Sequence, residues 1–186
     1  MANALRSRFG TARGLVRLAL SYGEVAAGRA AISVPEPAKI RRLVFVCQGN
    51  ICRSAFADVV AKARGMRAVS VGLSTDAGRP AHPPAVDAAK ALEFDLSDHH
   101  ARRIQDYVPQ DGDMLLAMET RQLWLLAADP RLAGVPRTLL GLWTAPKVPH
   151  LHDPFGLDQD YMLTCLTRIE AAVTALKPDF PGAILS

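Results

Sequence analysis

In the stretch VFVCQGNICRSAFADVV, from Val44 to Val60, the pattern of apolar residues changes at Cys47. An apolar run typical of a buried strand ends there, five residues separate Cys47 from Arg53, and a segment with helical spacing begins near Ser54. A short loop between a strand and a helix can curl so that its backbone N–H groups point inward. The N-terminus of the helix adds free amides and a positive dipole end. The stretch therefore predicts a cradle for a tetrahedral anion.

The residue types at this cradle suit phosphate chemistry. Arg53 carries a planar guanidinium fork that fits two phosphate oxygens. A helix N-terminus beside an arginine lowers the pKa of a cysteine, so Cys47 is a candidate nucleophile. Gly49 permits close approach of the backbone, Asn50 tolerates a left-handed conformation, and Ser54 can donate a hydrogen bond to the thiolate. Taken alone, a strand-to-helix turn that merely buries a cysteine explains the same residues.

Short β-rich runs alternate with helical patterns along the rest of the chain. The expected strands cover residues 43–47, 67–73, 113–118 and 137–142, and the expected helices cover 54–65, 83–94, 119–127 and 157–177. This alternation predicts the α/β class, with a four-stranded parallel sheet flanked by helices on both faces. Ligands of such folds bind at the carboxyl ends of the strands, which is where Cys47 lies.

The composition is that of an ordinary globular protein, with 49% apolar and 22% charged residues in 186. Three cysteines are too few for a disulfide framework and favour a reducing, cytoplasmic location. The formal net charge of +4 suits an anionic substrate, but no motif indicates nucleic-acid binding. No apolar run approaches the roughly 18 to 20 residues of a membrane span.

Residues 1–39 are expected to form a basic extension and a proline-containing linker, VPEPAK, before a domain at residues 40–186. The extension is rich in arginine and poor in acids, as organellar transit peptides are. A plain basic tail, or a helix that docks on a membrane or a protein partner, explains it equally well. Its glycines weaken the expected helix, whose apolar positions share one face: Leu5, Phe9, Val16 and Leu20.

The sequence resembles the low-molecular-weight protein tyrosine phosphatases. VCQGNICRSA looks like the signature loop of that family, in which Arg-Ser follows a cysteine after five residues. The stretches AVDAAKALEFDLSDHHARRI, DMLLAMETRQLWLL and HDPFGLDQDYM resemble later family segments in the same order. The resemblance covers roughly residues 40 to 177. It implies a phosphatase that acts on a phosphotyrosine protein or an aryl phosphate and needs no metal or cofactor.

The resemblance also implies a role for individual residues. Cys47 would attack phosphorus and form a phosphocysteine, while Arg53 holds the phosphate oxygens. Asp153 would protonate the leaving phenolate and then activate water, although from the residues alone it is a plain loop aspartate. The residues expected to bind phosphate are Gln48, Gly49, Asn50, Ile51, Cys52, Arg53 and Ser54. Those expected to support the loop are Asn50, Ser54 and His99.

Two further implications concern oxidation and substrate shape. Cys52 would pair reversibly with Cys47 under oxidation, or else fill the loop as a small buried residue. Phe155 would form one aromatic wall of the pocket, although the family's vertebrate members carry tyrosines at this position and at Gly156. The loop STDAGRPAHPP supplies no aromatic residue for the opposite wall.

Other functions remain open at this stage. Arsenate reductases share this loop, and a glutathione-coupled form fits best, because Cys165 lies far along the last expected helix and cannot relay a disulfide from a segment after the second strand. A phosphopeptide-binding module is a second alternative, although it needs neither Cys47 nor Asp153. Metal binding is rejected, since neither DHH at 98–100 nor HLHD at 150–153 has convincing ligand spacing.

Overall fold

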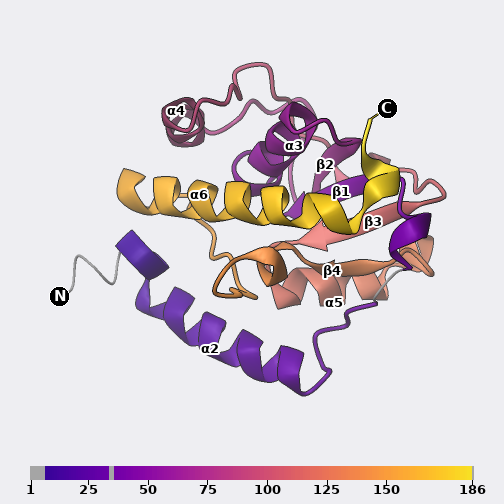
Figure 1. Ribbon diagram of the computed structural model, residues 1–186. Coiled ribbons are helices and arrows are strands. Elements are labelled where there is room, and N and C mark those ends of the chain that lie inside the picture. The colour runs from indigo at the N-terminus through magenta and orange to yellow at the C-terminus, as the bar shows by residue number, and fades with distance from the viewer. Residues whose placement is uncertain (1–6, 34–35, 186) are drawn as a thin grey trace.

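The computed structural model describes residues 7–33 and 36–185. Its centre is one sheet of four parallel strands in the order β2-β1-β3-β4 (Figure 1). The strands are β1 (Arg42–Cys47), β2 (Ala68–Gly72), β3 (Asp113–Ala117) and β4 (Arg137–Leu139). The predicted four-stranded parallel sheet is confirmed, and so is the position of the candidate phosphate loop directly after its first strand.

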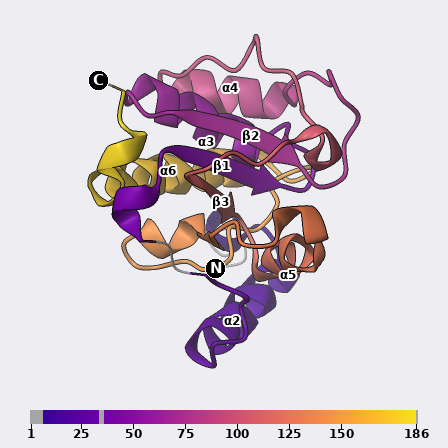
Figure 2. The ribbon, with the colours of Figure 1, turned by 90° about the vertical axis from the view of Figure 1, so that its right-hand side faces the viewer.

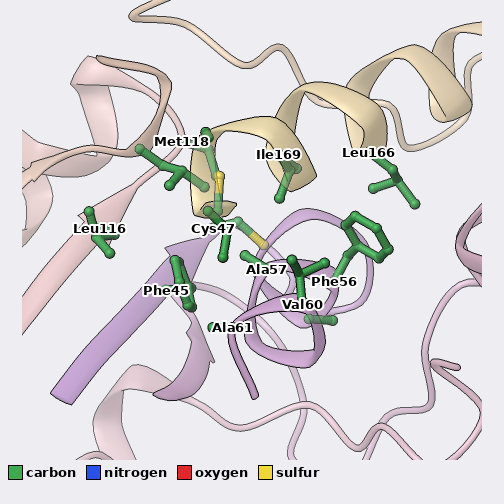
Figure 3. Packing of buried hydrophobic residues seen from close by; sticks show 14 of the residues in the cluster. Phe45, Cys47, Phe56, Ala57, Val60, Ala61, Leu116, Met118, Leu166 and Ile169 are labelled. Atoms are coloured by element: carbon green, nitrogen blue, oxygen red, sulfur yellow. The ribbon is translucent and has the colours of Figure 1, made fainter. Parts of the chain in front are cut away.

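Helices cover both faces of this sheet because its central strands are apolar along their length, and successive residues point to opposite faces. Leu43 and Phe45 of β1 point to the face that carries α3 (Arg53–Ala63), α4 (Pro83–Ala91) and α6 (Gln159–Leu176). Figure 3 shows this packing, with Phe56 of α3 and Ile169 of α6 among the side chains that lie between these two helices and the sheet. Val44 and Val46 point to the opposite face, where they pack with α5 (Thr120–Ala128). Near-continuous apolar strands are the expected result of this double coverage.

Local sequence explains where several of these elements begin and end. The Asp158 side chain accepts a hydrogen bond of 2.8 Å from Tyr161 N–H and so caps the start of α6. Pro178 follows its end, as predicted. The predicted fourth strand is too long, because the chain leaves the sheet after Leu139 and turns into a 3₁₀ helix. The 3₁₀ helices are Pro37–Lys39, Ile104–Asp106, Pro130–Leu132, Leu140–Trp143, Lys177–Asp179 and Pro181–Ala183.

The N-terminal segment forms a helix, α2 (Ala12–Ala26), at the end of the molecule opposite α4 (Figures 1 and 2). The apolar face expected for this helix is not its buried face, since Val16 and Leu20 are 58% and 53% exposed. Gly14 and Ser21 are buried instead, so close backbone approach holds the helix in place. Of the earlier expectations, Leu5 and residues 34–35 of the linker lie outside the described residues.

The far end of the same segment pairs with the edge of the sheet. Ser33 and Arg137 exchange two backbone hydrogen bonds, of 2.9 and 3.2 Å, in an antiparallel bridge to β4. The indole N–H of Trp124 donates to the Arg29 carbonyl oxygen at 2.9 Å. Within the residues described, no helix is long and apolar enough to cross a membrane.

Candidate active site

The loop between β1 and α3 surrounds the sulfur of Cys47, whose residue is only 3% exposed. Ser54 Oγ lies 3.0 Å from Cys47 Sγ, and the backbone N–H of Asn50 donates to the same sulfur at 3.2 Å. Both contacts hold the sulfur at the centre of the loop. The loop therefore folds around Cys47 in the way the spacing predicts.

Asn50 connects the loop to its surroundings. Its backbone lies in the left-handed region, with φ of 50°, as the sequence indicates for this position. Its side-chain amide donates to Ser54 Oγ at 2.8 Å, and its side-chain oxygen accepts from Arg102 N–H at 2.8 Å. His99 Nε2 lies 2.6 Å from the Asn50 carbonyl oxygen, so this nitrogen carries the proton. Burial lowers the pKa of His99, which keeps its ring neutral.

The end of β2 leaves room for the loop. A Cβ atom on Gly72 would lie 3.0 Å from the backbone carbon of Gly49 and 3.0 Å from the Cβ atom of Asn50. Two backbone hydrogen bonds hold the loop at this close approach, from Leu73 N–H to the Cys47 oxygen at 3.0 Å and from Ser74 N–H to the Gln48 oxygen at 2.9 Å. Glycine at residue 72 is therefore a packing requirement of the loop.

Arg53 is 1% exposed and lies among acceptors from distant parts of the chain. Its Nη1 donates to Glu119 Oε1 at 2.6 Å and to the Leu151 carbonyl oxygen at 2.8 Å, and its Nη2 lies 2.7 Å from Asp153 Oδ2. Burial opposes the charge on Arg53, but the two carboxylates outweigh it and raise the pKa of the guanidinium. Arg53 is therefore a permanent cation beside Cys47.

Glu119 is a partner of Arg53 that the sequence analysis did not identify. It follows β3, so it stands at the same carboxyl edge of the sheet as Cys47. Burial alone would raise the pKa of Glu119, but the adjacent Arg53 guanidinium outweighs burial and holds this pKa below its ordinary value. The ionised carboxylate fixes the orientation of the arginine. The position of an acidic residue directly after the expected strand was the sequence pattern that could have pointed to Glu119.

Asp153 reaches the same place from the loop between β4 and α6. Its side chain is 38% exposed, in contrast to the buried Arg53 that it contacts. Its Oδ1 accepts a hydrogen bond of 3.2 Å from the N–H of Phe155. The fold thus brings Cys47, Arg53 and Asp153 together, although Arg53 and Asp153 are 100 positions apart in the sequence.

These groups line a small open cavity of about 160 Å³ at the mouth of the loop. Of the predicted phosphate-binding residues, five contribute to its lining together with Cys47: Gln48, Gly49, Ile51, Cys52 and Arg53. Asn50 and Ser54 are buried and do not line the cavity. The predicted phosphate-binding residues therefore fall into two groups, five that line the cavity and two that do not.

Phe155 stands at the rim of this cavity, and 51% of it is exposed. Its ring lies 4.7 Å from the ring of His82, and the Arg79 guanidinium lies 5.9 Å from its centroid. Arg79 and His82 belong to the loop in which no aromatic wall was expected, and they were missed because their contact with Phe155 depends on the tertiary fold. A cation over an aromatic face stabilises the ring's position.

The other two cysteines are buried as well. Cys52 is buried, and burial together with the nearby Cys47 raises the pKa of its thiol well above the ordinary value. Cys165 lies within α6, where burial raises the pKa of its thiol to about 12. Both sulfurs are therefore protonated, weak nucleophiles at neutral pH.

Comparison with known proteins agrees with this geometry. The family model described as "Low molecular weight phosphotyrosine protein phosphatase" matches residues 42–180. The low molecular weight protein-tyrosine-phosphatase Wzb of Salmonella typhimurium is 30% identical over 132 residues, which are 69% of this chain and 87% of that protein. Wzb of Escherichia coli is 32% identical with the same coverage.

Solved structures show the same fold. The tyrosine phosphatase amsI of Erwinia amylovora superposes with a TM-score of 0.67 at 24% identity, covering 79% of this chain and 97% of that one. These matches define the class of protein, which is a cysteine-dependent phosphatase. The chain belongs to the low molecular weight phosphotyrosine protein phosphatase family, as its signature loop predicts.

Proposed function

We propose that this phosphatase hydrolyses phosphotyrosine-type monoesters through a cysteinyl-phosphate intermediate. One observation carries the proposal: the Cys47 sulfur, the Arg53 guanidinium and the Asp153 carboxylate line a single cavity of about 160 Å³. This cavity holds the nucleophile, the anion-binding group and the proton donor that the reaction requires. Wzb and its relatives are named for tyrosine phosphatase activity, which supports the same reaction here.

The first step forms the S–P bond. Cys47 Sγ attacks phosphorus as a thiolate, the bond between phosphorus and the phenol oxygen breaks, and Asp153 gives its proton to that oxygen. Within the described residues, the buried Arg53 Nε–H and the backbone N–H groups of Gly49 and Ile51 have no hydrogen-bond partner. These donors, with the first amides of α3, are suited to hold the phosphoryl oxygens.

The second step releases phosphate. The Asp153 carboxylate removes a proton from a water molecule, the water oxygen attacks phosphorus, and the S–P bond breaks to return the thiolate. Ser54 Oγ, 3.0 Å from Cys47 Sγ, stabilises the sulfur as a leaving group. Phe155 supports an aryl substrate by contact with its ring, at the open side of the cavity.

Aryl-phosphate hydrolysis by purified variants tests this proposal. In the presence of a chelator, the wild type should hydrolyse para-nitrophenyl phosphate, Cys47→Ser should be inert, and kcat of Asp153→Ala should fall on the order of 10²–10⁴-fold. Asp160→Ala is the matched control, because this nearby aspartate is exposed and outside the cavity. Full activity in Cys47→Ser would refute the phosphocysteine mechanism.

The alternatives make different predictions in the same assay. An arsenate reductase would be inactive on aryl phosphate and would consume arsenate with a thiol donor. The buried Cys165 argues against an internal disulfide relay. A phosphopeptide-binding module would retain its ligand but release no phosphate. Reversible pairing of Cys47 with Cys52 stays a prediction, and the raised pKa of Cys52 makes its thiol a slow attacking group.

A further inference from the structure

A second, larger cavity lies directly beside the catalytic one. It has a volume of about 540 Å³, within the range of about 300–1,000 Å³ typical of ligand pockets. Gln48 and Asp153 line both cavities, so the two are immediate neighbours. Its lining also includes Arg13 and Arg17 of α2 and Arg121 of α5.

This cavity carries unbalanced positive charge. Three arginines line it with two carboxylates, and both carboxylates, Glu119 and Asp153, already bind Arg53. Arg121 Nη2 lies 3.5 Å from Glu119 Oε2, a long contact. Arg13 and Arg17 form no ion pair with any residue in the described ranges. Two guanidinium groups are thus available to an anionic ligand that extends from the catalytic cavity.

The helix that presents these arginines is fixed to the acid loop. Thr11 Oγ1 lies 3.1 Å from His152 Nε2, next to Asp153 in sequence. A Cβ atom on Gly14 would lie 2.8 Å from the His152 ring, so glycine allows the helix to pack against it. Ser21 Oγ lies 3.4 Å from Thr120 Oγ1, and the Tyr22 hydroxyl donates to the Lys147 carbonyl oxygen. These contacts along α2 hold its arginines beside the catalytic cavity.

We propose that α2 and α5 form an anion-binding subsite that takes an acidic side chain flanking the phosphorylated residue of a peptide substrate. This proposal rests on the proposed phosphatase function. Arg13 and Arg17 lie outside residues 42–180, so the subsite is formed in part by chain that the family model does not match. The position of this cavity beside the catalytic one, its size and its two arginines without ion pairs among the described residues all fit a segment of the same substrate chain.

The test compares two phosphotyrosine peptides that differ only in their flanking residues, which are glutamate in one and glutamine in the other. The wild type should hydrolyse the glutamate peptide with a kcat/KM about tenfold higher, as two charge-assisted contacts allow. In the double variant Arg13→Gln/Arg17→Gln this ratio should fall close to one. High salt should reduce the ratio in the wild type, because exposed charges are screened.

The matched control is Arg8→Gln/Arg168→Gln, which removes the same charge from a separate cavity on another side of α2. It should keep the wild-type ratio, since neither arginine lines the proposed subsite. A wild-type ratio near one, or an unchanged ratio in Arg13→Gln/Arg17→Gln, would overturn the subsite while hydrolysis itself continues. If the wild type hydrolyses neither peptide nor para-nitrophenyl phosphate, the phosphatase mechanism fails and the subsite proposal fails with it.

Discussion

At the scale of single residues, Asn50 contributes to the loop through its left-handed backbone conformation and through the hydrogen bonds of its side chain. Its φ of 50° favours glycine or asparagine, and its side chain bridges Ser54 and Arg102. Asn50→Gly and Asn50→Ala should both lower kcat about tenfold, because Ser54 loses the amide donor that positions it. Asn50→Ala should also be less stable than Asn50→Gly by about 1 kcal/mol, the cost of a left-handed alanine.

Steady-state kinetics and urea unfolding measure the two effects separately. If Asn50→Ala keeps the wild-type kcat, Asn50 has no part in positioning Ser54. Equal stability of the two variants would show instead that the backbone relaxes away from its left-handed conformation.

Glu119 provides a second test at this scale. Its carboxylate is one of two that balance the buried Arg53, so Glu119→Ala should lower the free energy of unfolding by about 3 kcal/mol. Glu119→Gln keeps an acceptor oxygen for Arg53 Nη1 and should cost less. Both variants should lower kcat/KM for aryl phosphate, since the guanidinium loses its fixed orientation. Chemical denaturation and kinetics check this, and unchanged values for both would contradict the role assigned to Glu119.

At the scale of elements, two glycines of α2 have opposite roles. Gly14 packs against His152, whereas a Cβ atom on Gly23 would have no neighbour within 4 Å. Gly23→Ala should therefore stabilise the helix by roughly 0.5–1 kcal/mol, and Gly14→Ala should loosen the contact between α2 and the acid loop. Hydrogen exchange of the α2 amides should slow in Gly23→Ala and accelerate in Gly14→Ala. Faster exchange in both, or in neither, would mean that α2 is not held by this contact.

The same glycines show what sequence patterns capture and what they miss. Periodicity located every strand of the sheet and the helices α3, α4, α5 and α6, because each buries an apolar face that its own residues encode. The glycines of α2 indicated a weak helix, yet Gly14 is where that helix docks. Docking depends on His152, more than 100 residues away, and no local pattern records such a contact.

Some residues of the candidate site could likewise be predicted from local sequence, and others could not. The loop around Cys47 could be predicted because its nucleophile, its glycine and its arginine lie within one short stretch. Asp153 required the family resemblance, since a loop aspartate has no local signal of its own. Glu119 had the signal of an acid after a buried strand, but its contact with Arg53 depends on the fold, and so does the position of Arg79 at the cavity.

At the scale of the whole molecule, buried histidines make stability depend on pH. Burial lowers the pKa of His150 from 6.5 to about 4, and burial also lowers the pKa of His99 and of His152. Between pH 6.5 and about 4 the unfolded chain binds more protons than the folded one. The free energy of unfolding should therefore fall as the pH falls through this window, by about 3 kcal/mol for His150 alone.

Urea unfolding of the wild type and His150→Gln at pH 7.5 and pH 5 measures this contribution. The loss of stability on acidification should be smaller in the variant, because one group that protonates only in the unfolded chain is gone. An equal loss in both proteins would show that His150 protonates in the folded state as readily as in the unfolded one.

The central claim is that Cys47 carries the phosphoryl group during turnover. The most direct measurement is the intact mass of Asp153→Ala, quenched during reaction with para-nitrophenyl phosphate, followed by mapping of the modified peptide. We predict a mass gain of one phosphoryl group, located on Cys47 and absent from Cys47→Ser. If Asp153→Ala still releases nitrophenol while no phosphoryl group is found on Cys47, the phosphocysteine mechanism is contradicted.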